Sequence, residues 1–210
     1  MDGVIFDLDG TLWDATEPAY EALIRIEEKE GTEITSREKF MGLIGKPMDE
    51  IARAALLGME PDKKKKAFED FYELELALIR QGGSFLFPNL VETLEELKED
   101  FPLFIVSNCQ EGYIETFLEV HGLAYLFQDF LSWGASPQPK GDNILLIMKN
   151  HGLKSPVYVG DTRGDELASL HAGIPYYHIE LGFGQAEAPI ARINDHRQLV
   201  DIFKKRLSDE

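Results

Sequence analysis

The sequence predicts an α/β protein in which a mostly parallel sheet is covered by helices on both faces. Short runs of branched and aromatic residues recur along the chain and alternate with longer stretches whose apolar residues keep helical spacing. Glycines stand at the ends of several of these stretches, where helix C-termini favour them. Such an alternation joins neighbouring parallel strands through crossover helices, so helices are expected on both sides of the sheet.

The elements of this pattern can be assigned in order. Strands are predicted at residues 3–9, 103–108, 129–134, 156–161 and 176–180. The helices predicted between them cover residues 89–100, 111–122, 142–152 and 163–173. Leu90, Leu94 and Leu97 fall on one face of the first of these helices, as expected for a helix that packs against a sheet.

Residues 14–84 interrupt the alternation because they show only helical patterns. Residues 16–30 form a predicted helix with Thr16 as its N-cap and Gly31 as its stop. A second helix is predicted over residues 61–80, and its apolar face is expected to hold Phe68, Tyr72, Leu76 and Ile79. We therefore predict a discontinuous α/β core formed by residues 1–13 and 85–210, with residues 14–84 as an inserted helical domain.

The composition makes several classes of partner unfavourable. The chain of 210 residues has 38 acidic and 21 basic residues, which gives a formal charge of −17. Such a surface repels phosphate backbones and anionic lipid, so we expect binding to neither nucleic acid nor membranes. No apolar run approaches membrane-spanning length, and Met1 lies too close to the first strand for a signal peptide, so a cytoplasmic location is expected. The single cysteine, Cys109, cannot form an internal disulfide.

Polar side chains gather where the predicted strands end. Because ligands bind beyond the carboxyl ends of strands in an open parallel sheet, these side chains are expected to converge on one edge. They are Asp7, Asp9 and Thr11 after the first strand, Ser107 and Asn108 after the second, Asp161 and Asp165 after the fourth, and Lys140 just before the helix at 142. Carboxylates that lie so close together need a cation, and hard oxygen ligands suit Mg²⁺.

Each of these features alone has an ordinary explanation. An Asp-x-Asp pair is common in turns, and Ser107 and Asn108 are typical of a helix cap. Lys140 lacks the glycine-rich context of a nucleotide-binding loop and on its own is an ordinary surface lysine. Their occurrence in order, each at the same end of a predicted strand, favours a functional site.

The same residues resemble a known family. The segments DLDGTL at 7–12, VSN at 106–108, Lys140 and GDTRGD at 160–165 resemble the four signature motifs of the haloacid dehalogenase-like superfamily. The resemblance extends to HAGIP at 171–175 and is nearest to the phosphoglycolate phosphatase and β-phosphoglucomutase-like proteins with a small helical cap. It implies a Rossmann-like three-layer core with an inserted α-helical cap. Two positions depart from the pattern, Cys109 and Gly141, and both affect loop shape rather than the chemical side chains.

The resemblance also implies a role for each residue. Asp7 would be the nucleophile that forms an aspartyl-phosphate, and Asp9 would protonate the leaving alcohol and then deprotonate the hydrolytic water. Phosphoryl oxygens would be bound by Thr11, Ser107, Asn108 and Lys140.

A metal site follows from the same resemblance. Mg²⁺ would be held by the Asp7 carboxylate, the Asp9 backbone carbonyl and Asp161. Asp165 would orient a metal-bound water or Lys140 from outside the ligand set.

The expected function is Mg²⁺-dependent hydrolysis of a small phosphorylated metabolite, by a monomer or a weak homodimer. A sugar phosphomutase shares every catalytic residue and differs in whether the cap excludes water. A phosphorylation-dependent regulatory or binding module, similar to response-regulator receivers, is an alternative of another class. The helical insert and the second acid, Asp9, argue against it. Asp9 also disfavours dehalogenation, because it signals proton transfer to an oxygen leaving group.

Two loops are candidates for contact with the substrate. Residues 42–50 form a glycine-flanked segment whose Lys46 is a candidate specificity residue, although an exposed loop lysine is an equally good interpretation. The segment LGFG at 181–184 resembles a loop near the active-site rim of related phosphatases. The sequences of these two loops do not identify the substrate.

Overall fold

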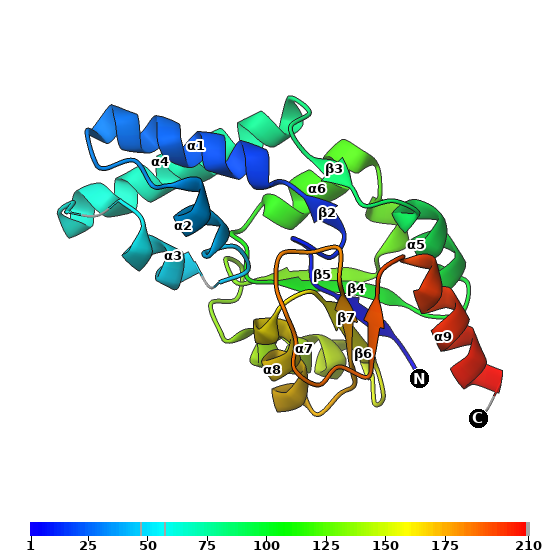
Figure 1. Ribbon diagram of the computed structural model, residues 1–210. Helices are drawn as coiled ribbons and strands as arrows, with labels where there is room; N and C mark the ends of the chain where they lie inside the picture. The colour runs from blue at the N-terminus through cyan, green and yellow to red at the C-terminus, as the bar shows by residue number, and fades with distance from the viewer. Residues whose placement is uncertain (47, 57, 209–210) are drawn as a thin grey trace.

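The computed structural model describes residues 1–46, 48–56 and 58–208. Within this part of the chain it shows a six-stranded sheet with the strand order β5-β4-β1-β6-β7-β8 (Figure 1). All neighbouring strands of this sheet pair in parallel, which confirms the predicted α/β fold. The strands are β1 (Val4–Phe6), β4 (Leu103–Ser107), β5 (Asp129–Ser132), β6 (Val157–Gly160), β7 (Tyr176–Ile179) and β8 (Ala191–Ile193).

β1 occupies the centre of the sheet. Val4 lies opposite Leu103 on one side and opposite Val157 on the other. All three residues of β1 are fully buried, because both faces of the sheet are covered. A strand that is buried on both faces has a continuous apolar sequence, which is why the run VIF predicted a strand here.

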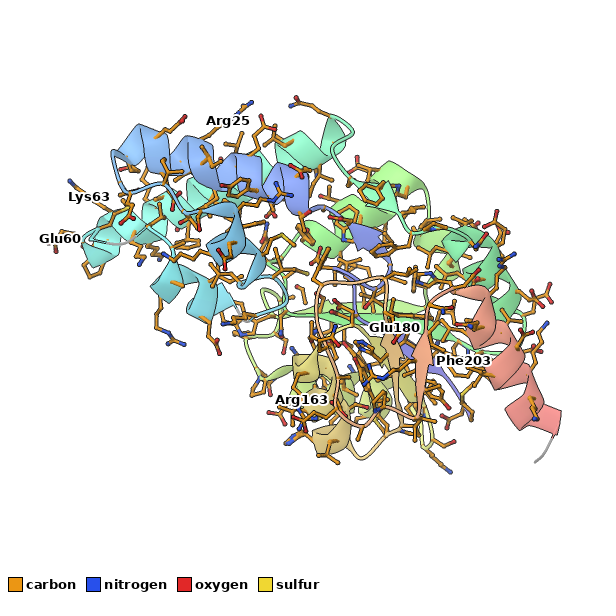
Figure 2. All side chains as sticks on the ribbon, in the orientation of Figure 1. Arg25, Glu60, Lys63, Arg163, Glu180 and Phe203 are labelled. Atoms are coloured by element: carbon orange, nitrogen blue, oxygen red, sulfur yellow. The ribbon has the colours of Figure 1, made fainter. Side chains whose placement is uncertain are left out.

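Helices cover the two faces of the sheet as separate layers. Val4 and Phe6 pack with residues of α5 (Leu90–Lys98), α6 (Tyr113–His121) and α9 (Arg197–Ser208). Ile5, which points to the opposite face, packs with α7 (Lys140–His151) and α8 (Arg163–Ala172). Phe203 of α9, labelled in Figure 2, makes edge-to-face contacts with Phe101 and Tyr177.

Several predicted details of these helices are confirmed. Leu90, Leu94 and Leu97 are all buried on the inner face of α5. Helices α6, α7 and α8 end in glycines with left-handed backbone conformation, as their sequences predicted. Lys140 is the first residue of α7, so this helix begins two residues earlier than its predicted start at 142.

The segment between β1 and α5 contains four helices among its described residues. They are α1 (Thr16–Glu30), α2 (Arg37–Met41), α3 (Met48–Ala54) and α4 (Pro61–Arg80). α1 and α4 lie side by side (Figure 1) and share an apolar cluster that includes Leu23, Ile26, Phe68 and Phe71. This cluster is distinct from the two that cover the sheet. Residues 14–84 are called the helical insert below.

Two details of the helical insert differ from the prediction. Thr16 is the first residue of α1 rather than its N-cap, and Asp14 Oδ1 accepts hydrogen bonds from Thr16 N at 2.8 Å and Oγ1 at 2.7 Å. The aspartate two residues earlier is therefore the side chain that satisfies the helix start. The buried face of α4 includes Phe71, Glu75 and Leu78, whereas the predicted Tyr72 and Leu76 are half-buried.

Short strands join the helical insert to the sheet. β2 (Trp13–Asp14) and β3 (Phe85–Leu86) pair antiparallel, with Trp13 opposite Leu86 and Asp14 opposite Phe85. Neither of these two-residue strands was predicted, and β8 and α9 were not predicted either. No helix in the described part of the chain is long and apolar enough to span a bilayer.

Replacing Leu94 by alanine tests the packing of α5. Leu94 is fully buried, so Leu94→Ala should lower the free energy of unfolding by about 2–5 kcal/mol, which chemical denaturation measures. Leu170→Ala is the control, because Leu170 on α8 is 74% exposed and its loss should change the free energy by no more than about 0.5 kcal/mol. Equal losses for the two variants would show that α5 does not pack as described.

Candidate active site

A tight turn after β1 places two carboxylates. Asp7 N donates to Val159 O at 2.8 Å, and Leu12 N turns back to donate to Leu8 O at 2.8 Å. Gly10 has a left-handed φ of +76°, and a Cβ there would lie 2.3 Å from Asp161 Oδ2. Only glycine fits this position, because the turn needs both the positive φ and the close approach.

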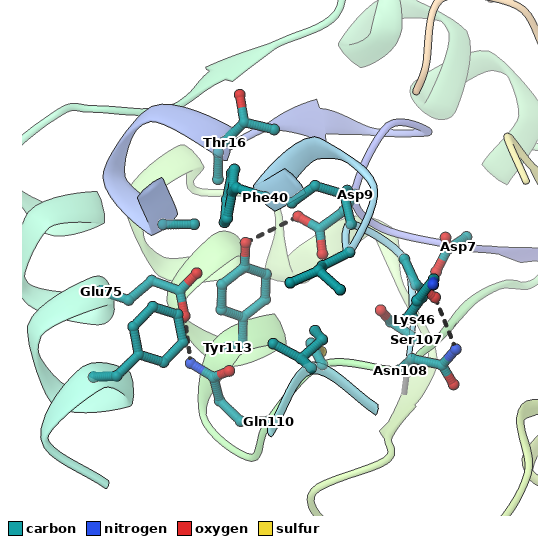
Figure 3. A pocket seen from close by; sticks show the side chains of 18 of the residues that line it. Asp7, Asp9, Thr16, Phe40, Lys46, Glu75, Ser107, Asn108, Gln110 and Tyr113 are labelled. Carbon is teal, nitrogen blue, oxygen red and sulfur yellow. Dashed lines mark hydrogen bonds between the residues drawn. The ribbon is translucent and has the colours of Figure 1, made fainter. Parts of the chain in front are cut away.

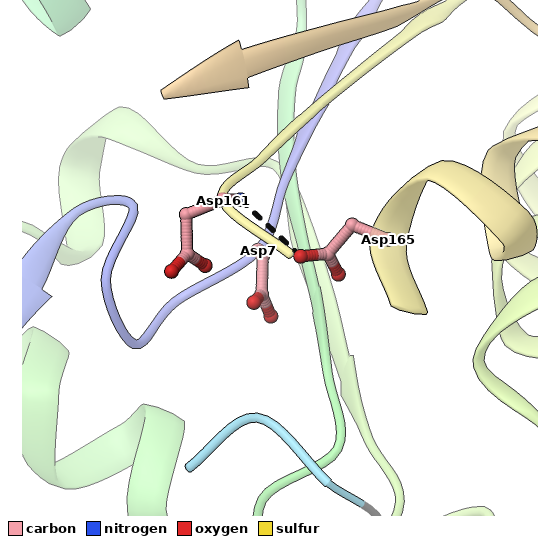
Figure 4. A group of neighbouring side chains, drawn as sticks. All are labelled: Asp7, Asp161 and Asp165. Atoms are coloured by element: carbon pink, nitrogen blue, oxygen red, sulfur yellow. Dashed lines mark hydrogen bonds between the residues drawn. The ribbon is translucent and has the colours of Figure 1, made fainter. Parts of the chain in front are cut away.

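Three buried carboxylates meet at the carboxyl edge of the sheet. Asp7 follows β1, Asp161 follows β6, and Asp165 lies in the first turn of α8. Each offers an oxygen that lies within 4.8 Å of the oxygens offered by the other two (Figure 4). The structure thus brings these sequence-predicted residues together as a candidate metal cluster.

Lys140 offsets part of this negative charge. Its Nζ donates to Asp7 Oδ1 at 2.9 Å and to Asp165 Oδ1 at 2.6 Å, and all three side chains are buried. Burial alone would lower the pKa of Lys140, but Asp165 and Asp7 outweigh it and raise the pKa above its ordinary value. The lysine therefore stays protonated between the two carboxylates.

Asp165 already has partners for both oxygens. Its Oδ2 accepts hydrogen bonds from Thr162 N at 2.9 Å and Thr162 Oγ1 at 2.6 Å, and the two residues form a capping box at the start of α8. Asp161 N also donates to this oxygen at 3.2 Å. Asp165 thus holds the loop after β6 and orients Lys140.

Asp161 has an oxygen available for a cation. Its Oδ2 accepts from Phe183 N at 2.7 Å, whereas its Oδ1 is buried without a hydrogen-bond partner among the described residues. A buried carboxylate oxygen needs compensation, and a hard divalent cation supplies it. The residues present therefore fit a hard divalent cation such as Mg²⁺, to which Asp7 and Asp161 could offer carboxylate oxygens.

The loop LGFG lies against this cluster, near the position that its sequence suggested. A Cβ on Gly182 would lie 2.4 Å from Asp161 Oδ2 and 2.4 Å from Gly10 O. The absence of a side chain at Gly182 lets the loop approach closely enough for Phe183 N to reach Asp161.

Burial and charge repulsion raise the pKa values of Asp7 and Asp161. Burial is the largest cause for Asp7, whose pKa is raised to about 7, and the charge of Asp165 adds to the increase while Lys140 opposes it. Burial, followed by the charges of Asp165 and Asp7, raises the pKa of Asp161 well above its ordinary value. Without a further cation, Asp7 and Asp161 therefore hold their protons to a higher pH than an exposed aspartate does.

Asp9 occupies a different environment from the cluster. Its Oδ1 accepts hydrogen bonds from Trp13 Nε1 at 3.0 Å and from Tyr113 Oη at 2.9 Å. Burial raises the pKa of Asp9 to about 6, although both hydrogen bonds oppose the increase. Sequence reasoning missed both residues. Trp13 lies four positions after Asp9, which was an available signal, whereas Tyr113 is 104 positions away and gave none.

A pocket lies between the helical insert and the sheet edge (Figure 3). The predicted residues that line it are Asp7, Asp9, Lys46, Ser107, Asn108 and Lys140. Asn108 Nδ2 also donates to Gly45 O of the insert at 3.1 Å. Cys109 lines the pocket as well, and burial raises the pKa of its thiol well above the ordinary value, which disfavours a thiolate.

Thr11 does not line this pocket. Its side chain is fully buried, its Oγ1 has no hydrogen-bond partner, and its N–H donates to Leu8 O. Thr11 O accepts from His196 Nε2 at 2.7 Å, which ties the turn to the segment before α9. A phosphate contact by Thr11 stays a prediction.

Residues 4–179 match the model of the haloacid dehalogenase-like hydrolases. The chain belongs to this family. A protein named phosphoglycolate phosphatase from Vibrio parahaemolyticus is 31% identical, over 91% of this chain and 88% of the relative. A protein of the same name from Vibrio cholerae is 30% identical, over 90% of this chain and 88% of the relative. The predicted enzyme class, a phosphoric monoester hydrolase of this family, is confirmed.

Solved structures show the same fold. A crystal structure named as a predicted phosphoglycolate phosphatase from Haemophilus somnus gives a TM-score of 0.86 at 23% identity, covering 97% of this chain and 98% of that one. A predicted phosphatase from Clostridium acetobutylicum gives 0.84 at 20% identity, with 97% and 98% covered. At these identities the likeness supports the fold alone.

Adding Mg²⁺ to metal-free protein should raise its melting temperature, and more at pH 8 than at pH 5.5. The pKa of Asp7 is raised from 3.8 to about 7, so at pH 5.5 protons compete with the cation. Saturation at about a hundred times Kd stabilises the folded chain by ~2.7 kcal/mol, which corresponds to several degrees. Scanning calorimetry with and without chelator measures the shift.

Without metal, the stability of the folded chain should fall as the pH rises. A salt-bridged acid has the opposite effect on stability. Because the folded chain binds more protons than the unfolded chain, metal-free protein should lose stability from about pH 4 to about pH 7. Asp161→Asn should reduce the Mg²⁺ shift, whereas the exposed control Asp62→Asn should retain it. An equal Mg²⁺ shift at both pH values would argue against binding at these carboxylates.

Proposed function

We propose that the protein is a Mg²⁺-dependent phosphatase that hydrolyses a small phosphate monoester through an aspartyl-phosphate on Asp7. The observation that carries the proposal is the arrangement around Asp7, which faces a pocket, bonds to Lys140 and lies beside the unpartnered Asp161 Oδ1. The names of the relatives, phosphoglycolate phosphatase, support phosphate ester hydrolysis.

In the first step, an Asp7 oxygen attacks phosphorus and the bond from phosphorus to the leaving oxygen breaks. Asp9 gives its proton to that oxygen, so an alcohol leaves. Trp13 and Tyr113 both donate to Asp9 Oδ1, which assigns the mobile proton to Oδ2. A pKa of about 6 keeps a fraction of Asp9 protonated near neutral pH, as a general acid requires.

In the second step, Asp9, now a carboxylate, takes a proton from water, and the water oxygen attacks the phosphorus of the aspartyl-phosphate. The bond between Asp7 and phosphorus breaks, phosphate leaves, and Asp9 is again protonated. Ser107, Asn108 and Lys140 line the pocket beside Asp7 and are proposed to bind the phosphoryl oxygens through both steps.

Mg²⁺ would be held by the carboxylates of Asp7 and Asp161 and by the Asp9 backbone carbonyl. Its charge would reduce the repulsion between the phosphoryl group and the buried acids. Asp165, with both oxygens already bonded, is proposed to position Lys140 and the Asp161 backbone rather than to bind the ion.

We propose that residues 14–84 act as a cap on a core of residues 1–13 and 85–210. Two polar contacts join the insert to the core beside the pocket, Asn108 to Gly45 and Gln110 to Glu75, and Arg80 Nη2 also donates to Thr116 Oγ1 at 2.9 Å. A cap that closes for the first step and admits water for the second suits a phosphatase. Its substrate would be a small metabolite in the cytoplasm, and the enzyme a monomer or weak homodimer.

Asp7→Asn should reduce turnover to background on every substrate, because an amide does not form the acyl phosphate. Release of inorganic phosphate measures this, and Asp62→Asn on the exposed face of α4 is the matched control. Release of inorganic phosphate by the wild-type enzyme also separates a phosphatase from a mutase, which passes the group to a sugar. Radiolabelled phosphate trapped on a residue other than Asp7 would overturn the mechanism.

Asp9→Asn should distinguish good from poor leaving groups. Alkyl phosphates need protonation of the leaving oxygen, so their turnover should fall by roughly a hundred- to ten-thousand-fold. p-Nitrophenyl phosphate needs no acid, so this variant should release a burst of about one nitrophenol per site and then turn over slowly, because the water lacks its base. Stopped-flow absorbance measures the burst. Equal losses with the two substrates and no burst would remove Asp9 from the proton transfers.

A further inference from the structure

The pocket has two chemically different ends. Figure 3 shows Asp7, Lys46, Ser107 and Asn108 grouped at one end and Glu75 and Gln110 at the other, with Asp9 between them. If phosphorus lies beside Asp7, the leaving group extends past Asp9 toward Glu75. The residues at that end therefore contact the part of the substrate that differs between phosphate esters.

Glu75 is a buried acid on the inner face of α4. Its side chain lies among the apolar residues of that face, and its Oε2 accepts a hydrogen bond from Gln110 Nε2 at 2.8 Å. No hydrogen bond from a described residue reaches Oε1. Burial raises the pKa of Glu75 to about 8. A carboxyl buried with one donor is costly, so a second donor from a ligand would be stabilising.

The rest of that end supplies no positive charge. Phe71, one helical turn before Glu75, lines the pocket, as do Phe40 and Ala19. Among the described lining residues the cationic side chains are Lys46 and Lys140. Lys140 is bonded to Asp7 and Asp165, and Lys46 lies at the Asp7 end (Figure 3). A leaving group with a carboxylate would meet an acid and aromatic rings there, without a counter-ion.

On the basis of the proposed function, we propose that Glu75, oriented by Gln110, is a specificity residue that accepts a hydrogen bond from the leaving group. The preferred substrates are small phosphate monoesters whose leaving group carries a hydroxyl or an ammonium, and esters whose leaving group carries a carboxylate are disfavoured. Phosphoglycolate, named in the relatives, belongs to the disfavoured class.

A series of esters of similar size tests this without any mutation. 2-Hydroxyethyl phosphate, 2-aminoethyl phosphate, propyl phosphate and phosphoglycolate differ only at the end remote from phosphorus. With saturating Mg²⁺ at pH 9, above the pKa of Glu75 so that its carboxylate is ionised, kcat/KM for the hydroxyl or the amino ester should exceed that for propyl phosphate and for phosphoglycolate by about tenfold or more, the scale of one hydrogen bond to a charged group. The better of the two esters identifies the donor.

Glu75→Gln is the matched variant, because it keeps the size of the side chain and, at pH 9, removes its charge. The variant should reduce the ratio of kcat/KM for the preferred ester to kcat/KM for phosphoglycolate by about tenfold. A purely structural role would not produce this change in selectivity. Glu73→Gln, on the exposed face of the same helix, should leave the ratio unchanged.

The outcomes separate this inference from the proposed function. Preference for phosphoglycolate, or an unchanged ratio in Glu75→Gln, overturns the role of Glu75 while phosphatase activity stands. Absence of phosphate release from every ester, p-nitrophenyl phosphate included, overturns the proposed function and the specificity with it. The wild-type series decides the preference even if the variant does not fold.

Discussion

The site depends on the cost of placing three carboxylates together away from water. Asp7, Asp161 and Asp165 are all buried, and one ammonium, that of Lys140, reaches only two of them. The fold accommodates the remaining charge through the main chain, because Asp165 accepts N–H groups at the start of α8 and Asp161 accepts one from the loop at Phe183. Among the described residues, Asp161 Oδ1 is left buried without a hydrogen-bond partner, so the position that favours a cation is set by these main-chain contacts as well as by the acids.

The sequence predicted the sheet and the acids for the same physical reason. A strand buried on both faces must be continuously apolar, so a carboxylate directly after it, such as Asp7 or Asp161, marks the strand's end and the sheet edge at once. β8 escaped prediction because it is three residues long and contains Arg192. Lys140 was identified, although its place as the first residue of α7 was not.

The contact between Tyr113 and Asp9 and the burial of Glu75 could not be read from sequence. Tyr113 reaches Asp9 across 104 positions, and no local pattern predicts a contact between residues so far apart. Glu75 lies on a helix with many charged residues, where an acid normally faces solvent. Its burial depends on where α4 is placed against Gln110, a tertiary contact 35 positions away. The residue proposed for specificity therefore had no local signal in the sequence.

The pairing of β2 with β3 has a consequence for how such a protein diversifies. Because Trp13 lies opposite Leu86 and Asp14 opposite Phe85, the two ends of the helical insert leave the sheet domain side by side. Chain inserted between adjacent points costs little closure entropy, and that cost grows only slowly with length. On the proposed division into cap and core, the insert could be exchanged, shortened or extended while the parallel register and the acids at the sheet edge stay in place. Under that proposal, chemistry and substrate choice could evolve on separate stretches of one polypeptide.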